Sequence, residues 1–352
     1  MRKSIIQFLV VIIFCTQGIL AQDGYFNQQE YRNKRIAERL YNEAVEAVQS
    51  GDDYGALYLL DSITKMQPNF SKAFIERGKI YFKKERKSDA LYEFQQVLSF
   101  EPNNGEAMFY NAYVKFTQDT TSVSLNDFSQ AIQNGYTPPH AYYYRGVMNL
   151  LDRNYNDAIA DFTLAIEQKA DYAKAYHDRG TAKMLLGDFQ GAIYDYRLAI
   201  TYDPELIMAY INMAAAKKKI GDFQGAEQDL TVVINIDSTN YTAYNNRGGA
   251  RYVLGKIEES KSDFEKAYNL NPDSYEILCN MGNALAKSGD YEDAIQWYDQ
   301  SMELNPEYDV AYLNRGLTRE MLGMLTEACE DWQKADELGS EEAEKYLKEC
   351  DK

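Results

Sequence analysis

The residues best suited to chemistry in this 352-residue sequence are arginines followed sixteen positions later by an acid. The spacing recurs five times, in the pairs Arg77 and Glu93, Arg145 and Asp161, Arg179 and Asp195, Arg247 and Asp263, and Arg315 and Asp331. A guanidinium beside a carboxylate can orient a substrate, or it can join two elements of a scaffold as an ion pair. Because the same pair is repeated along the chain, we interpret it as structural and expect no catalytic residues here.

Other reactive groups are few. The two histidines, His140 and His177, have no clear third ligand, so they make a poor metal site. The sequence has no phosphate-binding glycine loop, zinc-binding spacing or nucleophile motif. We therefore expect no metal, no cofactor and no enzymatic activity.

Composition and charge narrow the class of partner. Hydrophobic residues make up 45% of the sequence and charged residues 26%, which is typical of a folded protein. The chain has 54 acidic and 37 basic residues, a net charge of −17. Such a surface argues against nucleic acid or an anionic membrane as the main partner.

The first 21 residues predict an export signal. Arg2 and Lys3 precede an apolar run over residues 5–14, and Ala21 is a small residue suited to cleavage. The run is too short for a hydrocarbon core that needs roughly 20 apolar residues. We expect cleavage after Ala21, export to the periplasm or cell envelope of a bacterium, and no membrane insertion afterwards. An uncleaved membrane anchor is the alternative.

The rest of the chain follows a 34-residue period. The segments Tyr244–Gly248 and Tyr312–Gly316 are 68 residues apart, which is two periods. Nine units align without insertion over residues 37–342, with starts at residues 37, 71, 105, 139, 173, 207, 241, 275 and 309. A leader, residues 22–36, precedes them. Residues 343–352 extend the rhythm, and we predict a capping helix there.

Each unit predicts two helices joined by a turn. Position 15 carries glycine in six units, where a left-handed residue would end the first helix: Gly51, Gly187, Gly221, Gly255, Gly289 and Gly323. Small residues at positions 8 and 20 would let the two helices approach closely. One such pair cannot bury its apolar stripe alone, so neighbouring units must stack. The sequence predicts an all-α fold.

These positions resemble the tetratricopeptide repeat family. That family has small residues at positions 8, 20 and 27, proline at 32, and an aromatic residue at 24, here Phe94, Phe128, Phe162, Tyr196, Phe264, Tyr298 and Trp332. The resemblance covers residues 37–342. It implies a right-handed α-α superhelix, or solenoid, whose first helices line a concave groove that binds other proteins.

The acids and bases of the ion pairs occupy fixed positions in this repeat. The acid lies at position 23 of the second helix and the arginine at position 7 of the first. Two repeats without that arginine offer Lys115 with Asp127 and Lys217 with Asp229. Repeats 1 and 8 lack both partners, so we predict that the seven pairs form within single repeats.

The resemblance also places positions 2, 5, 6, 9, 12 and 13 in the groove. In repeats 1–4 these positions are unusually apolar, and the candidate protein-binding residues are Tyr41, Ile75, Phe82, Phe109, Tyr113, Phe116 and Tyr143. An exposed apolar strip of this kind marks a partner site. The alternative is that these side chains pack between neighbouring first helices.

The second half of the groove is expected to be polar. Position 6 of repeats 6–9 carries an asparagine ladder, Asn212, Asn246, Asn280 and Asn314. A side-chain amide offers a donor and an acceptor, so it can pair with a peptide backbone of any sequence. Lys218, Lys219 and Lys287 would add a basic spot that favours an acidic segment.

One disulfide is conceivable near the end of the chain. Cys329 falls in the last second helix and Cys350 in the capping helix expected to pack on it. An exported protein can oxidise such a pair, and buried free thiols are the alternative.

Together the sequence predicts a non-enzymatic scaffold that binds peptide or protein segments. A self-assembling module that forms homo-oligomers and a substrate-presenting subunit of an envelope enzyme complex are the alternatives.

Overall fold

The computed structural model describes residues 28–119 and 123–350, and these residues are helical or irregular, with no strand. The all-α prediction is confirmed. The predicted export signal lies outside the described residues. Within the described ranges, no helix combines the length and apolar character needed to cross a membrane.

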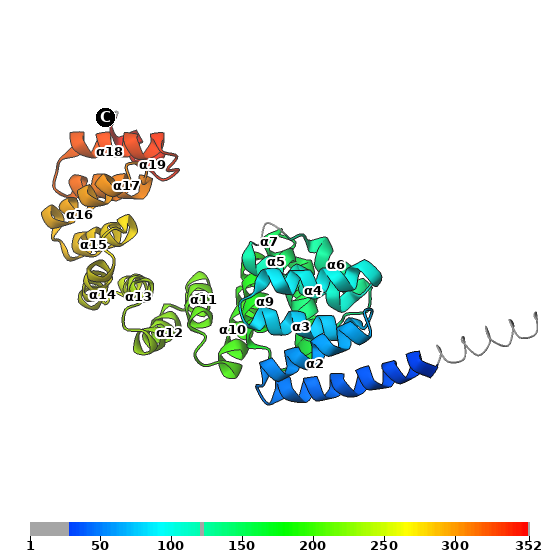
Figure 1. Ribbon diagram of the computed structural model, residues 1–352. Coiled ribbons are helices and arrows are strands. Elements are labelled where there is room, and N and C mark those ends of the chain that lie inside the picture. The colour runs from blue at the N-terminus through cyan, green and yellow to red at the C-terminus, as the bar shows by residue number, and fades with distance from the viewer. Residues whose placement is uncertain (1–27, 120–122, 351–352) are drawn as a thin grey trace, which may run out of the picture. The chain divides into compact units, whose positions relative to one another are not determined.

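The chain forms two compact units, which divide between Asp152 and Arg153. Figure 1 labels the helices of both units. In the first unit, a helix over residues 28–49 is followed by α2 (Asp53–Met66), α3 (Ser71–Lys83), α4 (Lys87–Phe100), α5 (Gly105–Gln118), α6 (Leu125–Gln133) and α7 (Pro139–Leu151). Consecutive helices from α2 to α7 contact each other, and α3 also contacts α5. First helices of neighbouring repeats therefore lie next to one another.

The second unit continues the same arrangement. It contains α8 (Tyr155–Gln168), α9 (Ala173–Leu185), α10 (Phe189–Tyr202), α11 (Ile207–Lys219), α12 (Phe223–Ile236), α13 (Tyr241–Val253), α14 (Ile257–Leu270), α15 (Tyr275–Ser288), α16 (Tyr291–Leu304), α17 (Asp309–Met321), α18 (Leu325–Glu337) and α19 (Ala343–Cys350). Contacts between α9 and α11, α13 and α15, and α15 and α17 again join first helices. The α19 helix packs on α18.

The helices keep the phase of the sequence repeat with two departures. First helices begin at residues 71, 105, 139, 173, 207, 241, 275 and 309, where successive units begin. The first helix of the first repeat instead already includes residue 28, inside the leader. In the third repeat, α6 is only 9 residues long, because Ser124 and Asp127 form a capping box that starts it late.

Turns between paired helices depend on left-handed residues. All six glycines at position 15 have positive φ, between 77° and 91°, as predicted. Two repeats have other residues at this position, which are also left-handed: Glu85 has φ 58° and Arg153 has φ 62°. A residue with a Cβ is strained in this conformation, so these two turns cost free energy that glycine would not.

Replacing Glu85 by glycine is therefore expected to stabilise the first unit by about 1 kcal/mol. The reverse change, Gly187→Ala, should destabilise the second unit by a similar amount. Urea denaturation followed by circular dichroism measures both free energies of unfolding. A Glu85→Gly variant that unfolds at lower urea than the unaltered chain would contradict the argument.

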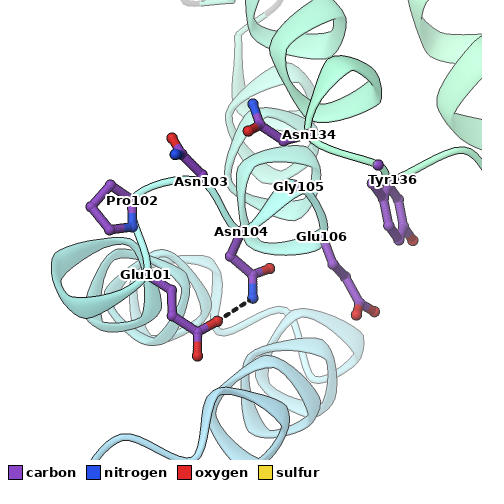
Figure 2. Close-up of a pocket in the computed structure, with 9 residues that line it drawn as sticks. Glu101, Pro102, Asn103, Asn104, Gly105, Glu106, Asn134 and Tyr136 are labelled. Atoms are coloured by element: carbon purple, nitrogen blue, oxygen red, sulfur yellow. Dashed lines mark hydrogen bonds between the residues drawn. The ribbon is translucent and has the colours of Figure 1, made fainter.

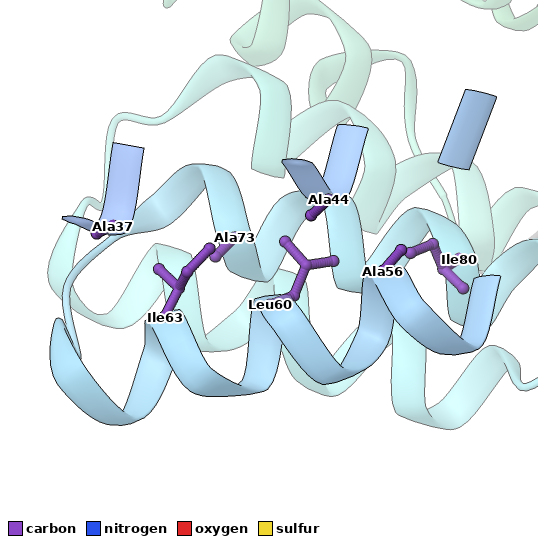
Figure 3. Packing of buried hydrophobic residues seen from close by; sticks show 7 residues of the cluster. All are labelled: Ala37, Ala44, Ala56, Leu60, Ile63, Ala73 and Ile80. Atoms are coloured by element: carbon purple, nitrogen blue, oxygen red, sulfur yellow. The ribbon is translucent and has the colours of Figure 1, made fainter. Parts of the chain in front are cut away.

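Close packing between paired helices rests on small residues. A Cβ added to Gly78, Gly180 or Gly282 would lie 2.6–2.9 Å from the aromatic ring at position 24 of the same repeat. The first repeat instead packs alanine and aliphatic side chains, and α3 of the second repeat adds Ala73 and Ile80 to them. All seven residues are buried and are shown in Figure 3: Ala37, Ala44, Ala56, Leu60, Ile63, Ala73 and Ile80.

Five of the predicted ion pairs form within single repeats. Their nitrogen–oxygen distances are 2.5–2.7 Å, in the pairs Arg77–Glu93, Arg179–Asp195, Lys217–Asp229, Arg247–Asp263 and Arg315–Asp331. In the third repeat Asp127 is used differently, because its carboxylate accepts hydrogen bonds from the backbone and hydroxyl of Ser124. The Arg145–Asp161 pair stays a prediction, because its two residues belong to different units.

The arginines also join neighbouring repeats, which the sequence pairing did not predict. Arg179 Nη1 donates to Thr163 Oγ1 in the preceding repeat at 3.1 Å, and Arg247 Nη1 donates to Thr231 Oγ1 at 3.2 Å. Each arginine therefore connects three helices, so it contributes both to the fold of one repeat and to stacking on the next.

Candidate functional site

Aromatic side chains on α3, α5 and α7 form a continuous cluster in the first unit. Ring centroids are 5.2 Å apart for Phe82 and Tyr113, 4.7 Å for Tyr113 and Tyr144, and 5.1 Å for Tyr144 and Tyr143. The Phe116 ring joins at 5.6 Å from Tyr144. We call these five residues the aromatic row. All five are half-buried, so each combines packing with some exposed ring surface.

The predicted apolar strip needs correction at two positions. Phe109 is only 1% exposed and Ile75 only 4%, so neither can form part of an open surface. Phe109 packs against several rings at once, among them Tyr136 at 5.1 Å and His140 at 4.9 Å. At these positions the alternative of packing between helices holds. Tyr41 is half-buried and lies against Phe70, at 5.8 Å.

One member of the aromatic row, Tyr144, was not predicted from the sequence. Tyr144 occupies position 6 of its repeat, which is the position of the asparagine ladder in repeats 6–9. Its ring contacts Tyr113, Phe116 and Tyr143. Position 6 therefore carries the residue that links the row between α5 and α7. The resemblance had already placed position 6 in the groove, so Tyr144 could have been predicted as a groove residue.

A charged network lies beside these rings. Lys79 Nζ donates to Glu106 Oε1 at 2.7 Å and lies 4.8 Å from the Tyr110 ring centroid. Burial opposes its charge, but Tyr110 and Glu106 outweigh burial and raise the pKa of Lys79 above its usual value. Lys79 therefore stays a cation with its own carboxylate partner.

Each histidine lies within hydrogen-bond distance of a polar side chain, Tyr136 for His140 and Asp178 for His177. Tyr136 Oη and His140 Nε2 are 2.8 Å apart, and burial above all lowers the pKa of His140, with Lys79 adding to the effect. Among the residues that the structure describes, no group of three histidine, cysteine or acidic side chains is arranged to hold a metal ion.

The four ladder asparagines lie in the second unit, on α11, α13, α15 and α17, and all are half-buried. Three of them reach back to the preceding repeat. The Nδ2 atom of Asn212 is 3.1 Å from His177 Nε2, that of Asn280 donates to Asn245 at 2.9 Å, and that of Asn314 donates to Asn283 at 2.9 Å. These bonds fix the amide planes and leave each of the three side-chain oxygens able to accept a further hydrogen bond.

Lys218, of the predicted basic spot, lies next to a lysine with a structural role. Lys217 forms an ion pair with Asp229, whereas Lys218 donates to the neutral amide of Asn246, at 3.3 Å. Burial, and next the charge of Lys219, lowers the pKa of Lys218. Among the described residues Lys218 has no carboxylate partner, so this half-buried ammonium would gain from an acidic ligand.

One hollow in the first unit follows from helix packing. It measures about 620 Å³ and lies between the turn before α5 and the turn after α6, as Figure 2 shows. Asn104 donates to Glu101 at 2.7 Å across the first turn. The turns approach closely because Gly105 has no Cβ, which would lie 2.6 Å from the Ala131 carbonyl oxygen. We attribute this hollow to packing.

The C-terminal cysteines lie at bonding distance. The sulfur atoms of Cys329 on α18 and Cys350 on α19 are 2.01 Å apart, with Cα atoms 5.9 Å apart. The third cysteine of the described residues, Cys279, is free and buried, and burial raises its pKa to about 12. Cys279 is therefore an unreactive thiol of the core.

Comparison with known proteins places these features in a family. Models described as tetratricopeptide or TPR repeat match residues 173–206, 241–274, 264–296 and 282–323. A search of curated protein sequences finds no match.

Solved structures share the fold. The APC/C hetero-tetramer Cut9–Hcn1 has a TM-score of 0.53 at 14% identity, over 84% of this chain and 59% of that one. The pilF protein of Pseudomonas aeruginosa has a TM-score of 0.51 at 20% identity, over 60% of this chain and 97% of that one. YrrB, described as a TPR protein with an unusual peptide-binding site, has a TM-score of 0.44 at 20% identity, over 53% of this chain and 97% of that one. Given its paired helices, its 34-residue phase and these family matches, the chain is a tetratricopeptide repeat protein.

Proposed function

We propose that this protein is a non-enzymatic scaffold that binds a segment of another protein along its first helices. Proteins of this family are generally non-catalytic scaffolds for protein interaction. The observation that carries the proposal is the aromatic row, which runs unbroken over three consecutive first helices with its rings half-exposed. Aromatic residues contribute binding energy out of proportion to their area, so such a row suits a partner segment laid across it.

We further propose export to the periplasm or envelope of a bacterium. The basic start, the short apolar run and Ala21 support cleavage of a signal peptide. The Cys329 and Cys350 sulfurs, at bonding distance, fit an oxidising compartment. Mass spectrometry of the N-terminus of the protein from its native cells tests this. An N-terminus at Gln22 is expected, and an intact Met1 would contradict it.

Substitutions in the aromatic row, compared with substitutions on the second helices of the same unit, test the binding proposal. A photo-crosslinking residue in place of Tyr143 should capture a partner in the native cells, which mass spectrometry then identifies. Replacing Tyr113 and Phe116 together by alanine should weaken binding of that partner about 10- to 100-fold, since both would be anchors. Isothermal titration calorimetry measures the affinity, and circular dichroism checks that the variant folds.

Tyr58 and Tyr92 supply the matched control. They lie on the second helices α2 and α4 and are 76% and 58% exposed. Replacing both by alanine should leave the affinity unchanged. Equal loss in both double variants, or no loss in either, would overturn the proposal. If the captured partner is a second copy of this chain, light scattering would show a dimer that the Tyr113 and Phe116 variant loses.

A further inference from the structure

A hollow of about 400 Å³ opens between α13, α15, α16 and α17 in the second unit. It lies at the end of the asparagine ladder, because Asn314 is both the last ladder residue and part of its lining. Its size lies within the range of pockets that enclose small ligands, so it can take one large side chain.

Part of the wall of the hollow is apolar. Tyr252 and Tyr291 contribute half-buried rings, and Ala286 and Leu317 contribute small and branched aliphatic surface. Met321 stands beside them with 65% of its surface exposed. Methionine adapts its shape and makes favourable contacts with aromatic rings. These walls fit a bulky apolar or aromatic side chain.

One of the polar side chains of the hollow is held as a donor. Asn283 Oδ1 accepts hydrogen bonds from Tyr298 Oη at 2.8 Å and from Asn314 Nδ2 at 2.9 Å. Both lone pairs of that oxygen are thereby used, and the amide plane is fixed. The Asn283 amide nitrogen, with no hydrogen-bond partner in the described residues, is left as a donor that needs an acceptor such as a backbone carbonyl.

Lys287 adds a positive charge one helical turn further along α15. It is exposed, and it forms no ion pair within the ranges that the structure describes. No acidic residue lines the hollow, although the chain has 54 acids. The site is therefore complementary to a carboxylate, unlike most of the surface of this protein.

The spacing of the two donors fits an extended segment. Lys287 is four positions after Asn283 on α15, which corresponds to about 6 Å along the helix axis. Two residues of an extended chain span about 6.6 Å, and their side chains point to the same side. An anchor residue bonded through its backbone to Asn283 would therefore place the side chain two positions away near Lys287.

We propose that this hollow binds an internal partner segment in which a bulky apolar or aromatic residue and an acidic residue are two positions apart. The inference rests on the proposed scaffold function and names a second contact for its partner. It identifies that partner chemically, as an extended segment with an aromatic anchor and a carboxylate side chain.

Short peptides test the proposal on the whole chain. The probes are fluorescently labelled, C-terminally amidated Gly-Phe-Gly-Glu-Gly and the reverse order Gly-Glu-Gly-Phe-Gly, because the geometry allows either direction. For the tighter probe, fluorescence anisotropy should show about tenfold weaker binding when phenylalanine becomes alanine. Binding should be about fivefold weaker when glutamate becomes glutamine. Absence of binding by both probes, or equal binding of the glutamate and glutamine peptides, would overturn the proposal.

Two exposed lysines, one in the hollow and one outside it, locate the effect. Lys287→Gln should make the glutamate and glutamine peptides bind equally, whereas Lys266→Gln, on the second helix α14, should preserve the difference. Both changes are at exposed positions, so both variants should fold. Retained selectivity in Lys287→Gln would refute this site. A partner still captured at Tyr143 would then show that the scaffold function survives without it.

Discussion

Replacing Asp263 by alanine is expected to lower the free energy of unfolding by about 3–5 kcal/mol. The Asp263 carboxylate is 3% exposed and accepts hydrogen bonds from Arg247 Nε at 2.9 Å, Arg247 Nη2 at 2.7 Å and Arg251 Nη1 at 2.8 Å. Alanine would leave two partly buried guanidinium groups without their shared acceptor. The loss is large because the cost of burying these charges remains while the attraction that offset it is gone.

An exposed acid nearby provides the control. Asp273 lies in the turn between α14 and α15 and is exposed, so Asp273→Ala should change stability by less than about 0.5 kcal/mol. Urea denaturation measures both variants, and amide hydrogen exchange shows whether α13 and α14 open before the rest of the unit. Equal stability of the Asp263→Ala and unaltered chains would show that the ion pair contributes nothing net to folding.

Much of this fold could be predicted from the sequence because each repeat packs its two helices with the same residue types at the same positions. A fixed phase of glycine, small residues and aromatic residues determines where helices end and how closely they approach. Gly187, for example, has the predicted positive φ, and a Cβ on Gly180 would meet the Tyr196 ring at 2.9 Å. Interactions inside one repeat were therefore accessible from residue types and spacing alone.

Interactions between repeats were harder to predict. The contact from Arg247 to Thr231 depends on how one repeat is rotated on the next, which the period does not specify. The late start of α6 depends on the capping box that Ser124 and Asp127 form together, and this removes Asp127 from the expected ion pair.

Exposure in the candidate site was the least predictable feature. The family resemblance assigns Phe109 and Tyr113 to the face of α5 that should line a groove. It does not say how closely α3, α5 and α7 approach. Rings from the surrounding helices and turns cover Phe109, whereas Tyr113 remains half-exposed. A residue on the groove side of a first helix therefore becomes a binding residue only where its neighbours leave it open.

Two adjacent glycines in α13 offer the sharpest test of helix packing. A Cβ on Gly248 would lie 2.7 Å from the Phe264 ring, whereas a Cβ on Gly249 would have no neighbouring atom within 4 Å. Gly248→Ala should destabilise the second unit by about 1–3 kcal/mol, because Phe264 is 2% exposed and has little room to move. Gly249→Ala should instead stabilise it by up to about 1 kcal/mol, since alanine is the better helix former.

The opposite signs separate packing from helix propensity. Both variants gain the same methyl group in the same helix, so any effect on the unfolded chain or on α13 alone is shared between them. Thermal unfolding followed by circular dichroism should therefore place the unaltered chain between the two variants. If Gly248→Ala were as stable as Gly249→Ala, the ring of Phe264 would have to shift freely. Close approach of α13 and α14 would then not be the reason for glycine at position 8.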